Sequence, residues 1–276
     1  MSFKRLVRFV DENGQTLYGD FGDIVPSADV TGSMVKVLDG NLETGWRPAG
    51  RQATITKLLS PLPSPGIVLC IAMNYKDHHK VPKYPSLFCK PPDALTGPYD
   101  TISIHPETQS MLDYEGELTV VISKDAKNVQ EDEALDYVLG YTSSNDISAR
   151  DWQMPEEISG WQFAYAKSFD GFAPVGPCLT STALIPDPQQ LKYTTKVNGQ
   201  VRQESSTKNM VFPVKQIIAH LSRGTTIRKG TFIMTGTAAG VGLFIKPEGS
   251  GFVKDGDVVE VEFEGIGSIR NKHTFE

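Results

Sequence analysis

The sequence has few cysteines and no long apolar segment. Its three cysteines, Cys70, Cys89 and Cys178, are widely spaced and form no Cys-x-x-Cys motif. This pattern indicates reduced thiols in an intracellular compartment, and it argues against a disulfide framework or a zinc site built on cysteine pairs. No apolar run approaches the roughly 20 residues that a membrane-spanning helix needs. We expect Cys70, in the apolar run IVLCIAM, to fill the core.

Positive charge is not in excess either. The formal net charge is −6, from 27 basic and 33 acidic residues, so electrostatics give no reason to expect a nucleic-acid or membrane partner. Residues 1–14 contain basic side chains but no apolar core of a secretory signal, and acidic residues appear early. We therefore predict an intracellular protein, located in the cytoplasm rather than in the mitochondrion.

Short β-rich segments are what the chain does contain. A hydrophobic content of 39% and a charged content of 22% are typical of a soluble globular protein. Three prolines within residues 59–66 indicate a linker or a rigid crossing. We therefore predict a small β-rich unit over residues 1–60 and a catalytic domain over residues 61–276.

The local patterns predict a strand-dominated α+β fold. Asn13-Gly14 predicts a hairpin within residues 3–21, and Asn198-Gly199 predicts a second hairpin within residues 192–205. Residues 26–40 look irregular or weakly stranded. Helices are expected over 131–141, which begins with acidic residues, and over 214–224, which carries apolar residues at helical spacing. Further strands are expected within 66–73, 117–123, 231–237 and 257–272.

A sparse set of carboxylates is the most informative feature. Glu115 and Glu117 lie two residues apart in DYEGEL, a segment with the alternation of a strand, so their side chains project to the same side. Two adjacent carboxylates repel each other unless a cation or a proton lies between them. With Asp146 they form an all-oxygen set that suits Mg²⁺, with Mn²⁺ or Ca²⁺ as substitutes.

A simpler interpretation is that Glu115 and Glu117 lie on the solvated face of an edge strand while Asp146 caps a turn. The surroundings argue against it. The acids are embedded among Tyr, Trp and β-branched residues, and Lys167 lies in a second stretch, AKSFDGFAPVGP, that is poor in ordinary surface residues.

Six segments, in their order along the chain, resemble the signature blocks of the fumarylacetoacetate hydrolase superfamily. The resemblance runs from about Ile67 to about Asn271 and is closer to the small branch that includes oxaloacetate tautomerases. The segments are IAMNYKDHHK, YPSLFCKPPDALTGP, DYEGEL, YTSSNDISARDWQ, AKSFDGFAPVGP and TGTAAGVG.

The resemblance implies a mixed β-sandwich roll, usually assembled as a homodimer. It implies a divalent-metal site at the three carboxylates and acid–base roles for His78 and Lys167. It also implies substrate binding by four residues, which are Tyr75, Arg150, Gln153 and Thr237. Without the family, Arg150 would be read as forming a surface salt bridge with Asp151 or Glu156.

One departure from the family pattern concerns hydrolysis. Members that hydrolyse or decarboxylate typically carry a glutamate three residues after the motif histidine, and this chain has Val81 there. Asp77 and Glu107 are candidate substitutes, although neither has the right spacing. Because valine cannot activate water, this departure favours metal-enolate chemistry over C–C hydrolysis.

We therefore predict a Mg²⁺-dependent enzyme acting on a small 2-oxo or β-dicarbonyl acid. The favoured reactions are keto–enol tautomerisation or decarboxylation of an oxaloacetate-like substrate, through a metal-stabilised enolate. Lys167, next to a cation, would have a lowered pKa and could transfer a proton. The alternatives are a C–C hydrolase of the acylpyruvate or fumarylacetoacetate type, an isomerase or lyase of a larger β-dicarbonyl, and a non-catalytic ligand-binding paralogue.

Overall fold

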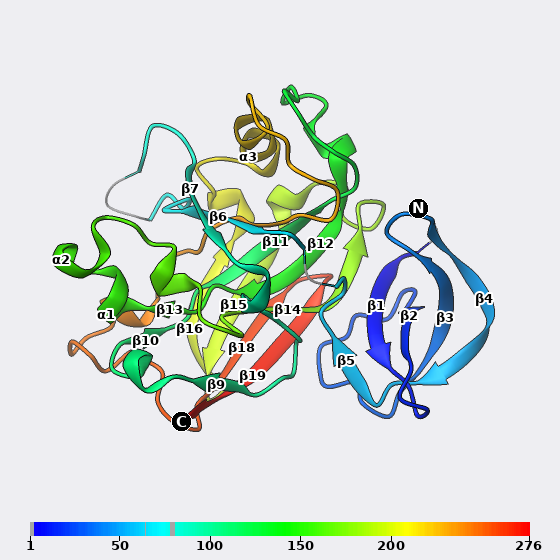
Figure 1. The fold of residues 1–276 in the computed structure, drawn as a ribbon, viewed down its shortest axis with the longest axis horizontal. Coiled ribbons are helices and arrows are strands. Elements are labelled where there is room, and N and C mark those ends of the chain that lie inside the picture. The colour runs from blue at the N-terminus through cyan, green and yellow to red at the C-terminus, as the bar shows by residue number, and fades with distance from the viewer. Residues whose placement is uncertain (1–2, 64, 78–80) are drawn as a thin grey trace.

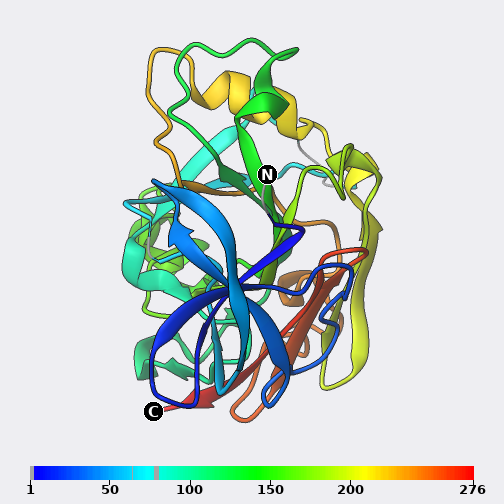
Figure 2. The same cartoon turned by 90° about the vertical axis from the view of Figure 1, so that its right-hand side faces the viewer.

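Strands dominate the computed structural model of the chain, which describes residues 3–63, 65–77 and 81–276. Figure 1 shows the amino-terminal strands gathered on one side of the molecule, the short helices α1 (Arg150–Gln153) and α2 (Glu156–Ser159) on the other side, and α3 (Val214–Leu221) at the top. Figure 2 shows the same amino-terminal strands facing the viewer in front of the rest of the fold. The expected strand-dominated α+β fold is confirmed.

The largest sheet has twelve strands and connects both ends of the molecule. Its main path runs through the strands β4, β3, β2, β1, β14, β12, β11, β17, β6 and β7, while β5 pairs with β1 and β8 pairs with β14. Their bounds are β1 (Arg5–Val10), β2 (Thr16–Asp20), β3 (Met34–Asn41), β4 (Gly45–Thr54), β5 (Lys57–Leu59), β6 (Val68–Ala72), β7 (Ser86–Lys90), β8 (Leu95–Thr96), β11 (Gly116–Ile122), β12 (Val138–Asn145), β14 (Ala173–Ser181) and β17 (Phe232–Met234).

A five-stranded sheet packs against the middle of the large one. Its order is β16 (Gln200–Ser206), β15 (Lys192–Val197), β18 (Val258–Phe263), β19 (Gly267–Phe275) and β9 (Ile102–Ile104). Leu118 and Val120 of β11 belong to the same buried cluster as Val261 and Phe263 of β18. A separate pair, β10 (Leu112–Asp113) and β13 (Ser148–Ala149), lies next to the site described below.

Helices are short throughout the described residues. The α-helices are α1 (Arg150–Gln153), α2 (Glu156–Ser159) and α3 (Val214–Leu221). The 3₁₀ turns are η1 (Pro92–Ala94), η2 (Pro106–Thr108), η3 (Ala134–Tyr137), η4 (Tyr165–Lys167), η5 (Pro188–Gln190), η6 (Thr207–Asn209) and η7 (Gly242–Phe244). The helix predicted over residues 214–224 is α3, whose buried face carries Val214, Ile217, Ile218 and Leu221.

Both predicted hairpins form, and turn chemistry explains them. Strands β1 and β2 pair up to Val10 opposite Thr16, and Gly14 in the connection has a φ of 76°. Between β15 and β16, Asn198 and Gly199 have φ values of 51° and 79°. Two consecutive positive φ angles match the twist of antiparallel strands, and Asn-Gly adopts them at low cost.

Two local predictions can be compared with the structure. Residues 26–40, expected to be irregular or weakly stranded, contain no strand up to Ser33 and then most of β3, in which buried Val35 and Val37 alternate with exposed Met34 and Lys36. The strand ends in the polar and glycine residues Asp39, Gly40 and Asn41, which weakened the pattern. In the helix expected over 131–141, only the 3₁₀ turn η3 is helical, because Val138 begins the fully buried strand β12. Burial in the sheet outweighs local helix preference there.

The amino-terminal strands are joined to the rest of the fold by strand pairing and by core packing. Arg5 and Leu6 pair with Thr180 and Leu179 of β14, and Leu6 shares a buried cluster with Val175. The boundary between residues 60 and 61 stays a prediction, as does the homodimer. No helix in the described ranges is long and apolar enough to cross a membrane.

We predict that His273 makes the stability of the fold depend on pH. Burial in β19 lowers the pKa of His273 to about 4. Between the ordinary value near 6.5 and about 4, the unfolded chain binds a proton that the folded chain does not. The free energy of unfolding should therefore fall by about 3 kcal/mol as the pH drops through this window. Urea titrations at a series of pH values measure this change.

The control for that experiment is His105→Asn, because His105 is exposed. His273→Asn should flatten the pH dependence between 6.5 and 4, whatever it does to stability at pH 8, while His105→Asn should retain the wild-type slope. Equal slopes for His273→Asn and the wild type would show that another group is responsible.

Candidate active site

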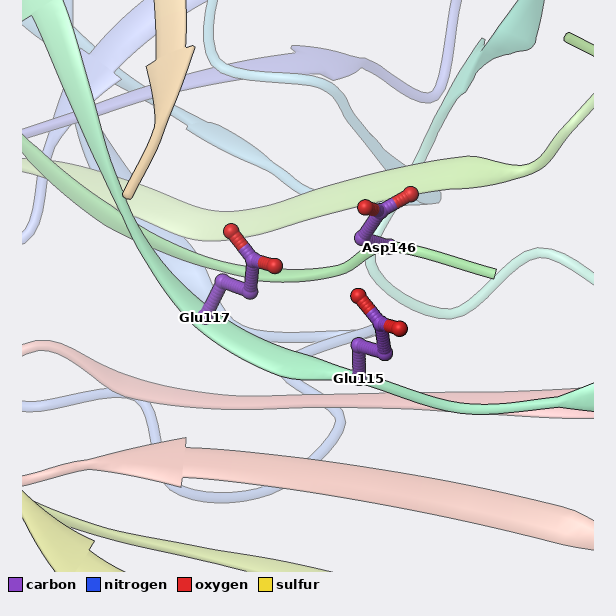
Figure 3. Close-up of side chains that lie close together, drawn as sticks. All are labelled: Glu115, Glu117 and Asp146. Atoms are coloured by element: carbon purple, nitrogen blue, oxygen red, sulfur yellow. The ribbon is translucent and has the colours of Figure 1, made fainter. Parts of the chain in front are cut away.

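The three predicted carboxylates converge in one place. Glu117 lies in β11, Glu115 precedes that strand, and Asp146 directly follows β12, which pairs with β11. Asp146 donates its backbone N–H to the carbonyl of Glu115 at 2.8 Å, which fixes the two segments together. Figure 3 shows the three carboxylate groups directed toward a common space, and one oxygen from each lies within 4.8 Å of the others.

Lys167 joins two of these carboxylates. Its ammonium nitrogen lies 2.9 Å from Glu115 Oε2 and 2.8 Å from Asp146 Oδ2, and its side chain is 2% exposed. The 3₁₀ turn η4 places it there, and the ring of Phe88 lies 5.1 Å from the same nitrogen. The sequence separation of 21 residues between Asp146 and Lys167 is thus closed by folding.

Arg150 forms its ion pairs inside the site. Its Nη2 lies 2.6 Å from Glu115 Oε1 and its Nε lies 2.9 Å from Asp113 Oδ2. Arg150 and Gln153 open and close α1, and Arg150 Nη1 donates to Gln153 Oε1 at 2.6 Å. The surface salt bridge considered as an alternative is not present among the ion pairs of the described residues.

Lys90 is a site residue that the sequence analysis did not assign. It is fully buried at the end of β7, with its ammonium nitrogen 2.7 Å from Asp146 Oδ1. It also donates to the carbonyls of Ile147 and Phe172 at 3.1 and 2.6 Å. A lysine that ends an apolar strand, directly before two prolines, was the signal that could have identified it.

Asp113 is a second site residue that the sequence pattern did not indicate. It is fully buried and accepts from the backbone N–H groups of Tyr114, Gly242 and Leu243 as well as from Arg150. It therefore connects Arg150 to η7. Its place in DYEGEL, two residues before Glu115, was visible, but nothing in the pattern separated a ligand from an anchor.

The charges of the site affect one another strongly. Burial raises the pKa of Glu115, but Lys167 and Arg150 outweigh burial and hold this pKa below its usual value. Burial, together with Asp146 and Glu115, raises the pKa of Glu117 well above the ordinary range. Burial opposes the charge of Lys167, yet Asp146 and Glu115 keep its pKa raised. The lowered pKa predicted for Lys167 referred to a neighbouring cation, and the protein groups alone act in the opposite direction.

This electrostatic imbalance fits a divalent cation. Four carboxylates lie together with three cationic side chains, namely Asp113, Glu115, Glu117 and Asp146 with Lys90, Arg150 and Lys167. The carboxylate of Glu117 accepts from Gly236 N–H at 2.6 Å, and among the described residues it forms no ion pair with a lysine or arginine. Hard oxygen ligands at this spacing suit Mg²⁺, Mn²⁺ or Ca²⁺.

A cavity of about 610 Å³ opens onto these groups. Its polar wall includes Glu115, Arg150, Gln153, Lys167 and Thr237. The rest of the wall is mostly apolar and includes Phe88, Met154, Phe163, Val241, Leu243 and Phe244. Such a combination of an apolar wall and a few convergent polar groups is typical of a small-molecule site.

The other predicted residues are placed differently. Tyr75 is fully buried, packs edge-on against Tyr193 with ring centroids 6.2 Å apart, and is not part of the described cavity wall. His78 lies outside the described residues. Val81 is 43% exposed. Asp77 lines the cavity and accepts from Ala239 N–H at 2.9 Å, whereas Glu107 lies outside the described wall.

Comparison with known families gives a match over most of the chain. A sequence profile described as fumarylacetoacetate (FAA) hydrolase, C-terminal, matches residues 67–273. This range contains all nine predicted site residues. Its beginning coincides with the start of the resemblance inferred from the six sequence blocks.

Related proteins come from several kingdoms. The mitochondrial oxaloacetate tautomerase of Xenopus laevis is 43% identical over 219 residues, which cover 78% of this chain and 67% of the relative. The mitochondrial oxaloacetate tautomerase of Bos taurus is also 43% identical and covers 78% and 68%. A protein of Archaeoglobus fulgidus is 45% identical over 79% of this chain and 82% of its own length.

Solved structures match nearly the whole chain. The 2-hydroxyhepta-2,4-diene-1,7-dioate isomerase of Mycobacterium marinum superposes with a TM-score of 0.82 at 31% identity, covering 99% of both chains. The fumarylacetoacetate hydrolase of Exiguobacterium antarcticum gives a TM-score of 0.81 at 32% identity and covers 99% of this chain and 100% of its own. The amino-terminal strands are therefore part of the shared fold.

The predicted cytoplasmic location is wrong by this comparison, because the frog and cattle relatives are named as mitochondrial proteins. The prediction rested on residues 1–14, and the structure builds Arg5–Val10 of that segment into β1. Arg5 there donates to the carbonyls of Gly22 and Gly265. Arg5 of this segment therefore serves the fold.

We predict that Glu115→Ala, Glu117→Ala and Asp146→Asn each abolish the stabilisation of the protein by Mg²⁺. A ligand that binds only the folded state, at about 100 times its Kd, stabilises it by roughly 2.7 kcal/mol. Removing one of three ligands should eliminate most of the resulting rise in Tm. Thermal melts with Mg²⁺ and with chelator measure this rise, and exposed Glu264→Ala is the matched control. A Mg²⁺-induced rise in Tm equal to that of the wild type in all three variants would exclude this metal site.

Proposed function

The chain belongs to the fumarylacetoacetate hydrolase family and is an enzyme of that superfamily, and from this premise we propose that it is a Mg²⁺-dependent keto–enol tautomerase of a small 2-oxo acid. Oxaloacetate is the first substrate to test, because relatives 43% identical to this chain are named for it. The observation that carries the proposal is the convergence of Glu115, Glu117 and Asp146 next to Lys167 at a cavity.

Glu115, Glu117 and Asp146 would hold the cation. A bound divalent ion supplies Lewis-acid polarisation of the 2-oxo carbonyl, which favours the enolate over the neutral ketone. Mn²⁺ and Ca²⁺ have the same preference for oxygen ligands, and Mg²⁺ is proposed because a small, rigid carboxylate set suits its octahedral preference.

Lys167 is the proton-transfer group in this proposal. Its Nζ lies between two carboxylates that favour the ammonium form, and its side chain forms part of the cavity wall. An ammonium at this place can deliver a proton to the substrate and take it back, which is the proton movement that tautomerisation needs. His78 is proposed as the second proton site.

Arg150 and Gln153 would bind and orient the carboxylate of the substrate. Both lie in the cavity wall on α1, and the hydrogen bond between them fixes their relative position. Arginine is suited to a carboxylate because its planar group offers parallel donors. Asp113 holds Arg150 from behind, which limits the movement of the guanidinium.

A second candidate, isomerisation of a longer 2-hydroxy-dienedioate, is favoured by the size of the cavity. A volume of about 610 Å³ exceeds what a four-carbon acid fills, and much of its wall is apolar. The solved structure from Mycobacterium marinum, which covers 99% of this chain, is named as such an isomerase. This reaction also moves a proton along an enolised 2-oxo acid, so the same groups would perform it.

Hydrolysis is ranked below these reactions, because the position expected to activate water carries Val81. Of the two candidate substitutes for the missing glutamate, Asp77 lies in the cavity wall and could face a water molecule there. Its carboxylate already accepts from the N–H of Ala239. Decarboxylation needs only an electron sink, so it stays an alternative to tautomerisation.

We predict that the native protein interconverts the keto and enol forms of oxaloacetate faster than it hydrolyses acetylpyruvate, and that both Mg²⁺ and an intact carboxylate set are needed. Enol absorbance and product mass, followed together with and without Mg²⁺, separate tautomerisation from decarboxylation and cleavage. A reaction without protein corrects for the spontaneous rate. Rapid Mg²⁺-dependent hydrolysis of acetylpyruvate would reverse the ranking.

We predict that Lys167→Met reduces kcat roughly 10²–10⁴-fold, because a positioned proton-transfer group contributes about that factor. The Mg²⁺-induced rise in Tm should persist, since the three carboxylates remain. Lys196→Met is the matched control, because Lys196 pairs with Glu260 on the five-stranded sheet, away from the cavity wall. Retention of wild-type kcat in Lys167→Met would remove this lysine from the mechanism.

A further inference from the structure

Strand β11 begins at Gly116, between Glu115 and Glu117, and at this glycine it lies directly against the five-stranded sheet. A Cβ added to this glycine would come within 2.1 Å of Thr195 Oγ1 and within 3.3 Å of Gln203 Oε1. A real Cβ atom cannot lie this close to Thr195 Oγ1, so only glycine fits here and the two segments are in tight contact. Gly116 separates Glu115 from Glu117, so this contact sets the position of both carboxylates relative to β15 and β16.

Gln203 of β16 makes the polar part of this contact. It is 1% exposed. Its Oε1 accepts from Gly116 N–H at 3.0 Å, and its Nε2 donates to Thr237 Oγ1 at 2.8 Å and to the carbonyl of Ala238 at 2.9 Å. Thr237 Oγ1 in turn donates to the carbonyl of Gly116 at 2.9 Å. The amide, the hydroxyl and the peptide of Gly116 therefore form a closed ring of hydrogen bonds.

The loop that follows β17 is thereby held from two sides. On one side Gly236 donates its N–H to Glu117 Oε2 at 2.6 Å. This position requires glycine, because its φ is 96° and an added Cβ would lie 2.7 Å from Asn74 Cβ. On the other side the loop is bound by Gln203. Thr237, Ala239 and Gly240 of this loop line the cavity.

We propose that Gln203 is a positioning residue that fixes the loop 235–240 against the segment Glu115–Glu117. Within the described residues, Gln203 is not part of the cavity wall, and its side chain is hydrogen-bonded to Gly116, Thr237 and Ala238 rather than to a carboxylate. This inference rests on the proposed function for its kinetic consequence. The ring sets the distance between the cavity wall at Thr237 and the segment that carries Glu115 and Glu117, because Thr237 and the backbone of Gly116 are bound to the same amide group.

Two of the three carboxylates have supports that involve neither Gln203 nor the loop 235–240. Lys167 and Arg150 hold Glu115, and Lys90 and Lys167 hold Asp146, whereas Glu117 accepts from Gly236 N–H of the loop. Loss of the Gln203 amide should therefore weaken the binding of a substrate or an enolate-like ligand more than the binding of Mg²⁺. A residue that served only global stability would not separate these two affinities.

The variants that test this are Gln203→Leu, Gln203→Glu and the control Gln200→Leu, in which an exposed glutamine of the same strand is changed in the same way. Gln203→Glu keeps the acceptor for Gly116 and the shape of the side chain but loses the two N–H donors. It therefore serves as the decisive variant if Gln203→Leu does not fold.

Three measurements on the full chain are needed. Hydrogen exchange followed by mass spectrometry should show at least tenfold faster exchange in peptides covering 235–240 for both Gln203 variants, and no change for Gln200→Leu. The Kd of oxalate, a planar dicarboxylate that resembles an enolised 2-oxo acid, should rise at least tenfold in the presence of Mg²⁺. The KM for oxaloacetate should rise similarly, while the Mg²⁺-induced rise in Tm is unchanged.

A double-mutant cycle with Thr237→Val sharpens the test. If both residues act through one ring, Gln203→Glu combined with Thr237→Val should weaken oxalate binding by no more than the larger single effect. Independent effects that multiply would overturn the ring.

Unchanged loop exchange and unchanged oxalate affinity in Gln203→Glu would overturn the proposal. So would an equal loss of Mg²⁺ and oxalate affinity, which would mean a general disturbance of the site. If the wild type neither binds oxalate nor converts oxaloacetate, the proposed function fails, and the exchange measurement still decides whether Gln203 holds the loop.

Discussion

The pairing of buried charges around Asp146 is the interaction on which the site depends. Lys90 and Lys167 bind its two carboxylate oxygens at 2.7 and 2.8 Å, and all three side chains are almost completely buried. An ionised group removed from water is costly unless opposite charges and hydrogen bonds compensate it. Each of these lysines is therefore fixed in place by its partner, and Lys167 transmits this order to Glu115.

The sheet architecture brings these charged groups together in a small volume. Antiparallel pairing of β11 with β12 places Glu117, in β11, next to Asp146, which directly follows β12. Strand β7 brings Lys90 from the edge of the same large sheet. The five-stranded sheet closes the other side through Gln203. Because the charged groups come from several strands and turns that are distant in the sequence, the site forms only when these elements have packed together.

Features that depend on neighbouring residues could be predicted from the sequence. Ion pairs between residues that are distant along the chain could not. Asn13-Gly14 and the spacing of Glu115 and Glu117 follow from turn geometry and strand alternation, which involve only neighbouring residues. The roles of Lys90 and Asp113 depend on partners 56 and 37 residues away along the chain, at Asp146 and Arg150. The helix expected over 131–141 failed for a related reason, because tertiary burial of β12 decided its conformation.

The cavity separates the choice of reaction from the choice of substrate. In the proposed function, enolisation of a 2-oxo acid needs only the carboxylates, Lys167 and a group that orients the substrate carboxylate. Glu115, Lys167 and Arg150 of this set lie in the polar wall of the cavity. Met154 and Phe244, which are 53% and 65% exposed, belong to the apolar part of the cavity wall, which we call the rim. Changes at the rim would therefore alter which 2-oxo acid fits while leaving the proton-transfer chemistry intact. A single fold can in this way serve a four-carbon acid and a longer one with the same inner residues.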